Sequence, residues 1–409
     1  MDKRPQHAPL WGISTHNNEM MVAQRPISEV ANIIGRTPFY LYDRQLLTKR
    51  VTELKAYLPD PLKLHYAIKA NPMPAVVNHM AGIVDGLDVA SQLELHTALN
   101  SGMSADNISF AGPGKQDHEL QSAIAAGILI NVESAHELQR IVKISQQLHC
   151  TARVALRVNP DYELKTSGMK MSGGPKQFGI DAEQIPDILK NWPSSVQFCG
   201  FHIFSGSQNL RSEAIIDAQT KTFALAESLA QFAPTPISTL NIGGGLGIPY
   251  FPGENRLDLE QIRDNLQKLI NQHHKALNHC ELVIELGRYL VGEAGVYISR
   301  IIDIKESRGT TFYIVDGGLH HHLANSGNFG QVIRKNYPVL LANKVSDTTL
   351  QPVQVVGPLC TPLDILGDKV MLPAAQVGDL IAITQSGAYG PTASPQQFLS
   401  HPSVTELLL

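Results

Sequence analysis

The sequence predicts an α/β fold: a closed (β/α)8 barrel followed by a smaller, mostly β domain. Three observations lead to this prediction. Short apolar segments alternate with stretches of helical periodicity, the alternation occurs eight times, and the helical periodicity then stops. Strands that alternate with helices form parallel sheets with helical crossovers, and eight such units in about 250 residues match a closed barrel. A doubly wound sheet of fewer strands is the alternative.

Each barrel strand is predicted from a short apolar, β-branched run that ends at a polar or glycine-rich segment. The eight runs are residues 62–71, 86–91, 107–115, 128–134, 152–160, 198–207, 238–245 and 282–288. Between them, apolar residues recur at the three- and four-residue spacing of one helix face. The helices predicted in this way include residues 91–102, 115–127, 134–148 and 214–232.

The chain divides into three predicted parts. Residues 1–36 are polar and contain proline, and we expect a flexible arm there. Residues 37–290 form the barrel. Residues 291–409 consist of short β-rich runs bounded by glycine, proline and aspartate, which predict the second domain. The segment TPFYLYD at 37–43 precedes the barrel and is expected to pair with strands of that β domain.

Composition excludes several classes of partner. The 409 residues carry a formal net charge of -4, without the basic surface that a nucleic-acid backbone requires. Apolar runs are too short to span a membrane, and the polar N-terminus does not resemble a secretory signal. The four cysteines are widely spaced and form no CxxC pair, so we expect a reduced, cytoplasmic protein without a disulfide framework.

Polar and glycine residues follow the predicted barrel strands at their carboxyl ends. Active sites of such barrels lie at this face, so these residues form one candidate site. They are Lys69, Asp88, Lys115, Glu133, Arg157, His202, Phe204, Ser207, Gly243, Gly244, Gly245, Glu285 and Arg288.

Members of this set match the three groups by which a protein binds pyridoxal phosphate: its aldehyde, its phosphate and its ring nitrogen. Lys69 can form a Schiff base when its amine is desolvated, although a lone lysine more often extends its ammonium into water. The glycines at 243–245 leave backbone N–H groups open to a phosphate, or form only a tight turn. Glu285 can keep a ring nitrogen protonated, or simply pair with Arg288 or Arg157. Because the lysine, the glycines and the carboxylate occur together, they favour a pyridoxal phosphate site over the separate structural explanation of each.

The chain resembles the fold-type III pyridoxal phosphate decarboxylases, which include the ornithine, diaminopimelate and carboxynorspermidine decarboxylases, with alanine racemase a more distant relative. The motifs that carry this resemblance are YAIKAN, DVASQLEL, GSQ, GGG, ELGR, VDGG, GPLCTPLD and SGAYG. The resemblance covers nearly the whole chain. It implies a barrel of the alanine racemase type, pyridoxal 5′-phosphate as cofactor, and decarboxylation of an α-amino acid through an external aldimine, with release of carbon dioxide and an amine.

The resemblance also implies roles for the residues of the barrel. Lys69 resembles the lysine that holds the cofactor, Asp88 a carboxylate near that lysine, and Arg157 a residue that orders both. Glu285 resembles the carboxylate on the pyridine nitrogen. The residues implied to bind the phosphate are Ser207, Gly243, Gly244, Gly245, Arg288 and Tyr389.

The β domain is implied to complete the site. Cys360 and Asp364 resemble a segment that reaches across a dimer interface, which implies an obligate homodimer with shared active sites. Cys360 of the partner chain is then the expected acid that protonates Cα. The residues expected to contact substrate are Asp364, Thr361 and His320.

Two departures from the family pattern concern the cofactor face and the substrate. Family members place a histidine three residues before the serine of GS, where this chain has Phe204, so we expect Phe204 to stack on the ring and leave the role of His202 open. Thr361 and the segment LHHHLANSGNFG replace the charged residues that diaminopimelate decarboxylases carry. The chain is most similar to a subgroup that contains decarboxylases of carrier-protein-bound glutamate and exosortase-associated decarboxylases, so the substrate is free or tethered to an acyl carrier protein.

The sequence leaves alternative functions open. The protein is alternatively an amino-acid racemase or a diaminopimelate decarboxylase. A protein that only carries the cofactor, without catalysis, is a further alternative, although such carriers lack a β domain. No metal is expected, because three consecutive histidines, His320 to His322, cannot all face one ion from a regular strand. The glycine-rich loop at 167–179, with Lys165, Lys170 and Lys176, is either a solvated loop or a lid that contacts a substrate carboxylate or a pantetheine phosphate.

Overall fold

The computed structural model describes residues 5–162, 169–170, 172–273, 275, 277, 279–327 and 334–409. The chain forms two compact units. Unit 1 comprises residues 1–49, 249–256 and 290–409, and unit 2 comprises residues 50–248 and 257–289. Residues 249–256, which the sequence prediction includes in the barrel, therefore group with the β-rich unit.

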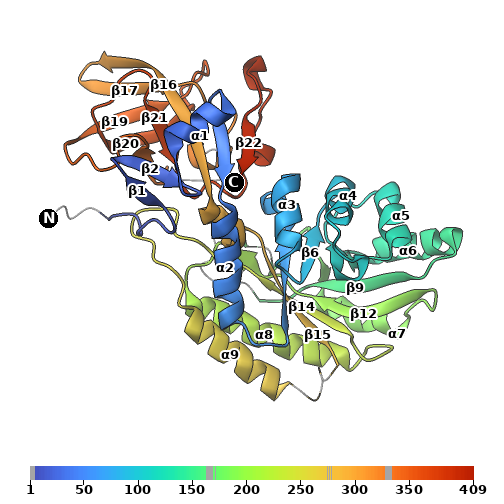
Figure 1. Ribbon diagram of the computed structural model, residues 1–409. Helices are drawn as coiled ribbons and strands as arrows, with labels where there is room; N and C mark the ends of the chain where they lie inside the picture. The colour runs from blue at the N-terminus through green and yellow to red at the C-terminus, as the bar shows by residue number, and fades with distance from the viewer. Residues whose placement is uncertain are drawn as a thin grey trace. The chain divides into compact units, whose positions relative to one another are not determined.

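Unit 2 is a closed barrel of eight parallel strands (Figure 1). They are β5 (Leu62–Ala67), β6 (Gly86–Val89), β7 (Ile108–Phe110), β8 (Leu129–Val132), β9 (Ala152–Asn159), β12 (Val196–His202), β14 (Thr239–Gly244) and β15 (Glu281–Leu286). Hydrogen bonding follows the order β9-β12-β14-β15-β5-β6-β7-β8, and β8 pairs with β9 to close the ring. The predicted closed barrel is confirmed, and the doubly wound alternative is excluded.

Two short pairings adjoin the barrel. Strand β11 (Ile180–Asp181) extends the sheet beside β9, and β10 (Met169–Lys170) pairs with β13 (Gly206–Ser207). Strand β11 pairs with the last two residues of β9, and β13 follows β12, so both pairings lie at the carboxyl ends of barrel strands.

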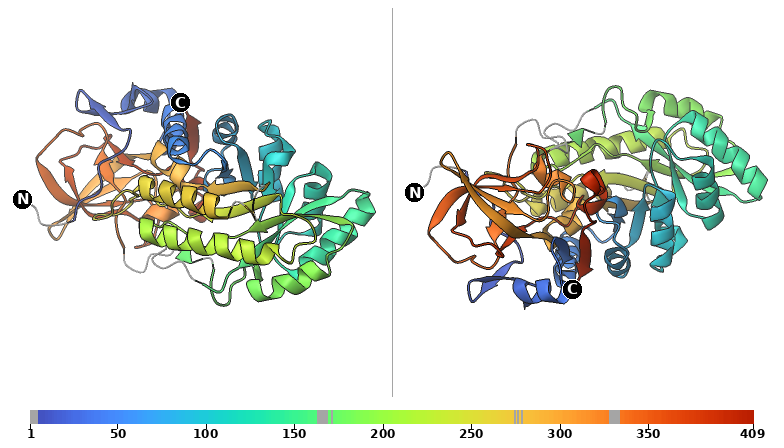
Figure 2. Two further views of the ribbon diagram at one scale, coloured as in Figure 1. Left: turned by 90° about the horizontal axis from the view of Figure 1, so that it is seen from below. Right: turned by 90° about the horizontal axis from the view of Figure 1, so that it is seen from above.

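Helices cover the outside of the barrel strands (Figure 2). They are α3 (Pro74–Ala81), α4 (Gln92–Asn100), α5 (Asp117–Ala126), α6 (Ala135–Leu148), α7 (Ile185–Lys190), α8 (Ser212–Ala230) and α9 (Leu259–Gln272), with α2 (Arg44–Tyr57) and α10 (Arg288–Val291) at the unit boundaries. No helix among the described residues is long and apolar enough to span a membrane.

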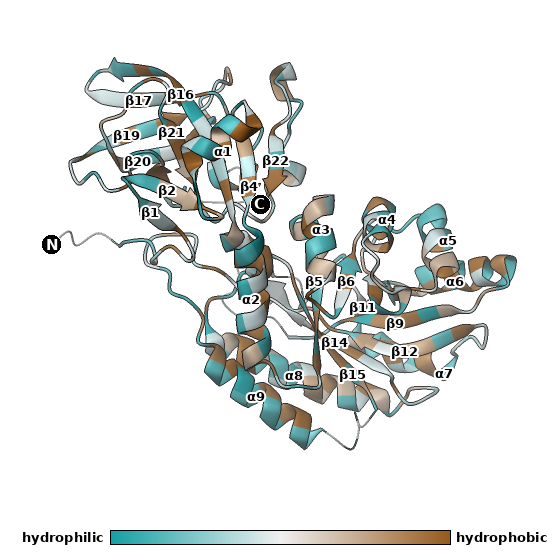
Figure 3. Ribbon diagram, viewed as in Figure 1, coloured by the Kyte–Doolittle hydropathy of each residue, from teal (hydrophilic) through white to brown (hydrophobic). Residues whose placement is uncertain are grey.

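Helix α6 illustrates why these sequences form helices. Ser134 caps its N-terminus by accepting a hydrogen bond of 3.0 Å from the backbone N–H of Glu137. Leu138, Ile141 and Ile144 recur at helical spacing and are buried against the strands. Hydrophobic and hydrophilic segments alternate in the same way along α8 and α9 (Figure 3). One face of each helix therefore stabilises the barrel while the other stays in water.

Unit 1 is built on an eight-stranded sheet. Its strands are β4 (Phe39–Tyr42), β16 (Gly295–Ser307), β17 (Thr310–Val315), β18 (Val339–Leu341), β19 (Leu350–Val356), β20 (Ile365–Pro373), β21 (Leu380–Ile383) and β22 (Thr405–Leu408), and one short helix, α11 (Leu323–Ser326), follows β17. Strand β4 pairs antiparallel with β16 and parallel with β22, so the segment before the barrel is part of this sheet.

The N-terminal segment differs from the flexible arm that the sequence predicts. Residues 14–26 form a small sheet of β1 (Ser14–His16), β2 (Glu19–Val22) and β3 (Arg25–Pro26), and α1 (Ile27–Ile34) follows. Met20, Ile27 and Val30 are fully buried in a core with Phe39 and Leu41. Burial of these apolar side chains outweighs the polar character of the segment, so it folds as part of unit 1.

We predict that Leu120→Ala, in α5, lowers the free energy of unfolding by about 2–5 kcal/mol, because its side chain is 0% exposed and its removal leaves a cavity. Leu93→Ala, in α4, is the matched control: Leu93 is 78% exposed, and we expect a change of about 0.5 kcal/mol or less. Urea denaturation measures both values. Equal losses for the two variants would contradict the packing described here.

Candidate active site

A cavity of about 220 Å³ lies at the carboxyl ends of the barrel strands. It brings together side chains from β5, β6, β9, β12 and β15, with the segment after β7 and the loop before β11. The predicted site residues that line it are Lys69, Asp88, Arg157, His202, Phe204 and Glu285. These six residues span more than two hundred positions of the sequence, from Lys69 to Glu285, so the closed barrel is what creates the site.

Lys69 extends from a single 3-10 turn, Ile68–Ala70, directly after β5. Ile68 and Ala70 are buried, and the hydroxyl of Tyr66 donates a hydrogen bond of 2.8 Å to the carbonyl of Asn71, which fixes the turn. The side chain of Lys69 is exposed and lines the cavity. The backbone of this lysine is therefore held rigidly while its amine remains accessible to a ligand.

Glu285 ends β15 as a buried carboxylate with two partners. His202 Nε2 lies 3.3 Å from Glu285 Oε2, and Asn241 Nδ2 donates a hydrogen bond of 3.0 Å to the same oxygen. Burial alone raises the pKa of Glu285, but His202, with the charges of Lys69 and Arg157, outweighs it and holds that pKa below its ordinary value. Glu285 is thus an ionised carboxylate at the floor of the cavity.

Arg157 is held by an acidic neighbour and an aromatic ring. Its Nη1 donates a hydrogen bond of 2.7 Å to Glu133 Oε1, and its guanidinium lies 5.0 Å from the ring centre of Phe178. Glu133 also accepts a hydrogen bond of 2.6 Å from the backbone N–H of Gly112. Glu133 therefore orients Arg157 and ties it to the segment after β7, but it does not itself line the cavity.

Asp88 lies near the end of β6, and only one of its two carboxylate oxygens, Oδ1, contacts other side chains. Its Oδ1 accepts a hydrogen bond from the hydroxyl of Ser109 and lies 3.2 Å from His65 Nδ1. Its Oδ2 is buried and has no hydrogen-bond partner among the described residues. One oxygen is therefore left for a ligand.

The glycine run after β14 approaches neighbouring backbone too closely for any side chain. A Cβ on Gly244 would lie 2.0 Å from the carbonyl oxygen of Glu285, and one on Gly245 would lie 2.4 Å from that of Gly206. Gly243 and Gly245 also have φ values of 69° and 88°, which favour glycine. The run thus packs against β13, where the buried hydroxyl oxygen of Ser207 has no partner among the described residues.

These features fit pyridoxal 5′-phosphate. A phosphate requires close approach to hydrogen-bond donors; the glycine run carries no side chains, and the hydroxyl of Ser207 beside it has no partner among the described residues. The ionised Glu285 suits a cationic ring nitrogen, and the accessible amine of Lys69 suits an aldehyde.

Asn241 links two of these features. Its Nδ2 bonds Glu285, and its Oδ1 accepts a hydrogen bond of 2.8 Å from the backbone N–H of Gly243. The sequence analysis did not single out Asn241, although its position two residues before Gly243, on the same face of the strand, was a usable signal. It also missed Phe178, which lies in a loop without periodicity, and His65, which it treated as part of an apolar strand.

Lys115 differs from the prediction that grouped it with the candidate site. It does not line the cavity. Its ammonium is buried, lies 2.9 Å from Glu137 Oε1, and donates hydrogen bonds to the carbonyls of Gly112 and Asn131. Its role in the fold is to join β8 and α6 to the segment after β7.

Of the three lysines of the loop before β11, Lys176 is partly buried, whereas Lys165 and the side chain of Lys170 lie outside the described residues.

Of the remaining predicted site residues, Arg288 begins α10 in unit 2 and the others belong to unit 1. Cys360 is exposed, Thr361 and Tyr389 are partly buried, and Asp364 is buried. The carboxylate of Asp364 accepts hydrogen bonds of 2.6 and 2.9 Å from the backbone N–H groups of Leu319 and Leu359, so it stabilises the turns of its own unit.

The three consecutive histidines of unit 1 are all buried. His321 donates from Nε2 to the carbonyl of Pro402 at 2.9 Å, and His322 Nε2 lies 2.8 Å from the hydroxyl of Ser386. Burial lowers the pKa of both His320 and His322 to about 3, so both rings are neutral at physiological pH.

Comparison with known proteins agrees with this geometry. Residues 44–292 match the family described as "Pyridoxal-dependent decarboxylase, pyridoxal binding domain". The chain is 37% identical over 380 residues to the L-glutamyl-[BtrI acyl-carrier protein] decarboxylase of Niallia circulans, covering 91% of this chain and 88% of that protein. It is 32% identical to the 2-[(L-alanin-3-ylcarbamoyl)methyl]-2-hydroxybutanedioate decarboxylase of Staphylococcus aureus, covering 89% and 92%.

A solved structure shows the same fold over almost the whole chain. The diaminopimelate decarboxylase of M. jannaschii in complex with L-lysine superimposes with a TM-score of 0.87 at 26% identity, covering 97% of this chain and 92% of that one. Sequence and structure therefore lead to one conclusion. This chain belongs to the pyridoxal-dependent decarboxylases, and it is an enzyme that removes carbon dioxide from an α-amino acid with pyridoxal 5′-phosphate as its cofactor.

Proposed function

We propose that this enzyme is a biosynthetic decarboxylase whose α-amino acid substrate is joined through its side chain to a larger group, with a glutamyl group on an acyl carrier protein as the first candidate. The observation that carries the proposal is the 37% identity to a decarboxylase of that substrate. The second relative is named for an alanine unit joined at its C3 to a hydroxybutanedioate, which is again an amino acid with a large appendage. A free amino acid, including diaminopimelate, is the alternative.

The side chains around the cavity support this choice of substrate over a free diamino acid. Among the described lining residues, the only cationic side chains are Lys69 and Arg157, and Arg157 is already paired with Glu133. In unit 1, Cys360 is followed by Thr361, whereas diaminopimelate decarboxylases carry an acidic residue directly after this cysteine. A glutamyl group whose side-chain carboxyl is joined to a carrier protein fits these residues better than a free diamino acid.

The residues of this chain would hold the cofactor as follows. Lys69 is its covalent attachment point, and Asp88 and Arg157 orient it. Ser207, Arg288, Tyr389 and the glycines at 243–245 bind its phosphate, and Phe204 stacks on its ring. When bound, pyridoxal 5′-phosphate supplies a cationic ring that accepts the electron pair left behind as carbon dioxide departs.

Glu285 would keep that ring cationic, because a carboxylate beside the ring nitrogen favours the protonated form. His202 and Asn241 hold the carboxylate ionised and oriented, which gives His202 the role that the sequence left open. This pairing also separates the proposal from a racemase on the same fold, since racemases of this type pair the ring nitrogen with arginine. A carboxylate at this position strengthens the electron acceptor that decarboxylation needs.

The reaction ends when Cα takes up a proton in the place of carbon dioxide. We propose that Cys360 of a second copy of the chain donates it, with Thr361, Asp364 and His320 near the substrate, in a homodimer with shared active sites. Support comes from the GPLCTPLD motif and from the exposure of Cys360. We also propose a cytoplasmic location, which suits a chain whose four cysteines are all unpaired.

The substrate prediction is tested by measuring carbon dioxide release from two panels. One panel holds the free L-amino acids, including glutamate and diaminopimelate, and the other holds glutamyl groups loaded on a phosphopantetheine-bearing carrier protein. We expect release from the loaded carrier at a kcat/KM at least about tenfold higher than from any free amino acid, since remote binding energy raises this ratio. Release only from a free amino acid would refute the tethered substrate, and loss of optical activity without gas would indicate racemisation.

Cys360→Ala is expected to slow turnover by about 10²-fold or more, because the proton donor to Cα is lost. Cys150→Ala is the matched control, since Cys150 is also exposed and unpaired but lies in the barrel unit before β9, and we expect unchanged turnover. Carbon dioxide release under saturating substrate measures both. Undiminished turnover of the Cys360 variant would remove this residue from the mechanism.

His202→Phe is expected to raise the pKa of Glu285 by about 1 unit or more, because the imidazole that contacts the carboxylate is lost. A carboxyl whose pKa is lowered by folding stabilises the protein above its unfolded pKa of about 4.3, and this stabilisation disappears as the pH falls through the folded pKa. The variant is therefore less stable than the wild type at neutral pH. The difference shrinks as the pH falls below about 4.3 and disappears below the folded pKa of Glu285. Carbon-13 NMR of the Glu285 carboxyl and acid denaturation measure the two effects, with His136→Phe, at an exposed histidine of α6, as the control.

A further inference from the structure

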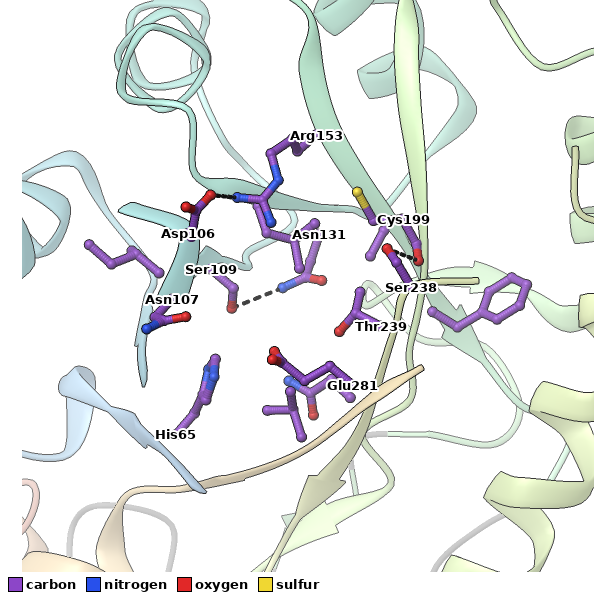
Figure 4. A pocket seen from close by; sticks show the side chains of 16 residues that line it. His65, Asp106, Asn107, Ser109, Asn131, Arg153, Cys199, Ser238, Thr239 and Glu281 are labelled. Atoms are coloured by element: carbon purple, nitrogen blue, oxygen red, sulfur yellow. Dashed lines mark hydrogen bonds and ion pairs between the residues drawn. The ribbon is translucent and has the colours of Figure 1, made fainter. Parts of the chain in front are cut away.

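A second cavity, of about 210 Å³, lies at the opposite, N-terminal end of the barrel strands (Figure 4). Its walls come from the first residues of β7, β8, β9, β14 and β15. Asp106 and Glu281 at its rim are exposed, so the cavity is open to water. This end of the barrel has no part in the function proposed above.

The barrel interior between the two cavities is polar. Interiors of such barrels are usually filled by layers of branched aliphatic side chains. Here His65, Ser109, Asn131 and Asn241 occupy that level, each at most 7% exposed, and all four also line the N-terminal cavity. Figure 4 shows the imidazole of His65 and the hydrogen-bonded side chains of Ser109 and Asn131 turned into that cavity. Buried polar groups cost stability, which calls for a reason for their presence.

Three of these side chains, those of Asn131, Ser109 and His65, form hydrogen-bonded contacts that end on Asp88. Asn131 Nδ2 donates to Ser109 Oγ at 3.3 Å, and the Ser109 hydroxyl donates to Asp88 Oδ1. His65 Nδ1 lies 3.2 Å from the same oxygen. Asp88 is thus the residue at which the chain from the N-terminal cavity meets the catalytic cavity, which Asp88 also lines.

The two oxygens of Asp88 are used differently. Oδ1 receives both the Ser109 hydroxyl and the His65 contact, whereas Oδ2 is buried with no partner in the described part of the chain. A carboxylate bonded on one side only can accept a proton from His65 on Oδ1; rotation of the neutral carboxyl group then turns this O–H toward the catalytic cavity. Transfer of the proton to a basic group there returns Asp88 to the carboxylate. The geometry therefore suits transfer across the carboxylate.

The charges around His65 favour a proton on its ring. Burial lowers the pKa of His65, but the charge and hydrogen bond of Asp88 on β6, with Glu281 and Glu285 on β15, outweigh it, and the pKa is raised from 6.5. Arg153 lines the far wall of the same cavity and is paired with Asp106. An imidazole whose pKa is raised binds a proton more readily than a free one, and it can exchange that proton with water in the cavity.

We propose that His65 is a positioning residue that passes protons from the N-terminal cavity to Asp88, so that the interior of the barrel is a proton route to the catalytic cavity. The inference rests on the proposed function, because it takes the cavity around Lys69 as catalytic. Decarboxylation consumes one proton per turnover: RCH(NH3+)COO− + H+ gives RCH2NH3+ + CO2. A large tethered substrate that covers the carboxyl face leaves the opposite face free for proton uptake.

The test is a pH jump on the holoenzyme without substrate, with the visible absorbance of the bound cofactor followed by stopped flow. His65→Gln keeps a hydrogen-bond donor but cannot carry a proton, and we expect the absorbance change to slow by about tenfold or more. Thr239→Val, in the wall of the same cavity but outside the hydrogen-bonded chain, is the matched control and should relax at the wild-type rate.

A second variant tests the entry point. The ring of His65 lies against Gly86, where a Cβ would be 2.3 Å from Nε2, so His65→Ala leaves an imidazole-sized space at the cavity. We expect added imidazole to restore the relaxation rate of this variant and to leave His65→Gln unchanged. Restoration supports the route, and its failure overturns it.

The comparison of wild type with His65→Gln distinguishes a proton route from a charge effect. Equal relaxation rates in wild type and His65→Gln overturn it, even if the midpoint of the absorbance titration moves, since a moved midpoint alone reports a charge effect. Because these experiments need no substrate, their failure is distinct from a failure to release carbon dioxide from either substrate panel, which contradicts the proposed function instead.

Discussion

The active site depends on keeping the carboxylate of Glu285 ionised inside the barrel. A buried charge is costly unless charged and hydrogen-bonding partners compensate it. Here His202 and Asn241 contact one oxygen of Glu285, and Lys69 and Arg157 add positive charge. Because β12, β14 and β15 are neighbours in the barrel, each can supply one member of this group at the same level. The strand order is therefore what makes the charge tolerable.

The same arrangement explains why the remaining cations and anions of the site occur in pairs. Glu133 pairs with Arg157 and His65 with Asp88. Each pair joins strands that are neighbours or next neighbours, so the charge is balanced locally. A ligand that enters this cavity finds oriented groups whose solvation has already been replaced by protein contacts, which is the condition for strong electrostatic effects on a reaction.

Much of the fold was predictable from the sequence, because parallel barrel strands are continuous apolar runs whose last residues are polar. Runs such as 62–71 and 282–288 therefore indicated both the strand and the site residues at its end. The N-terminal segment was not predictable in the same way, since Met20, Ile27 and Val30 are scattered among polar residues and are buried by strands distant in sequence. Lys115, like Lys69, follows an apolar run in the sequence, and only the folded chain distinguishes them, because Lys115 is buried against Glu137 and the carbonyls of Gly112 and Asn131. His65 lies within an apolar run, where nothing in the sequence marks its contact with Asp88.

Asn241 has a consequence for the size of the ligand that this protein accepts. One amide side chain bonds both Glu285 and the backbone of Gly243, the first residue of the glycine run. In the function proposed above, Glu285 faces a ring nitrogen and the glycine run binds a phosphate, so a single side chain links the two recognition groups. In that arrangement a shorter or longer ligand reaches both groups only if Asn241 gives up one of its two hydrogen bonds.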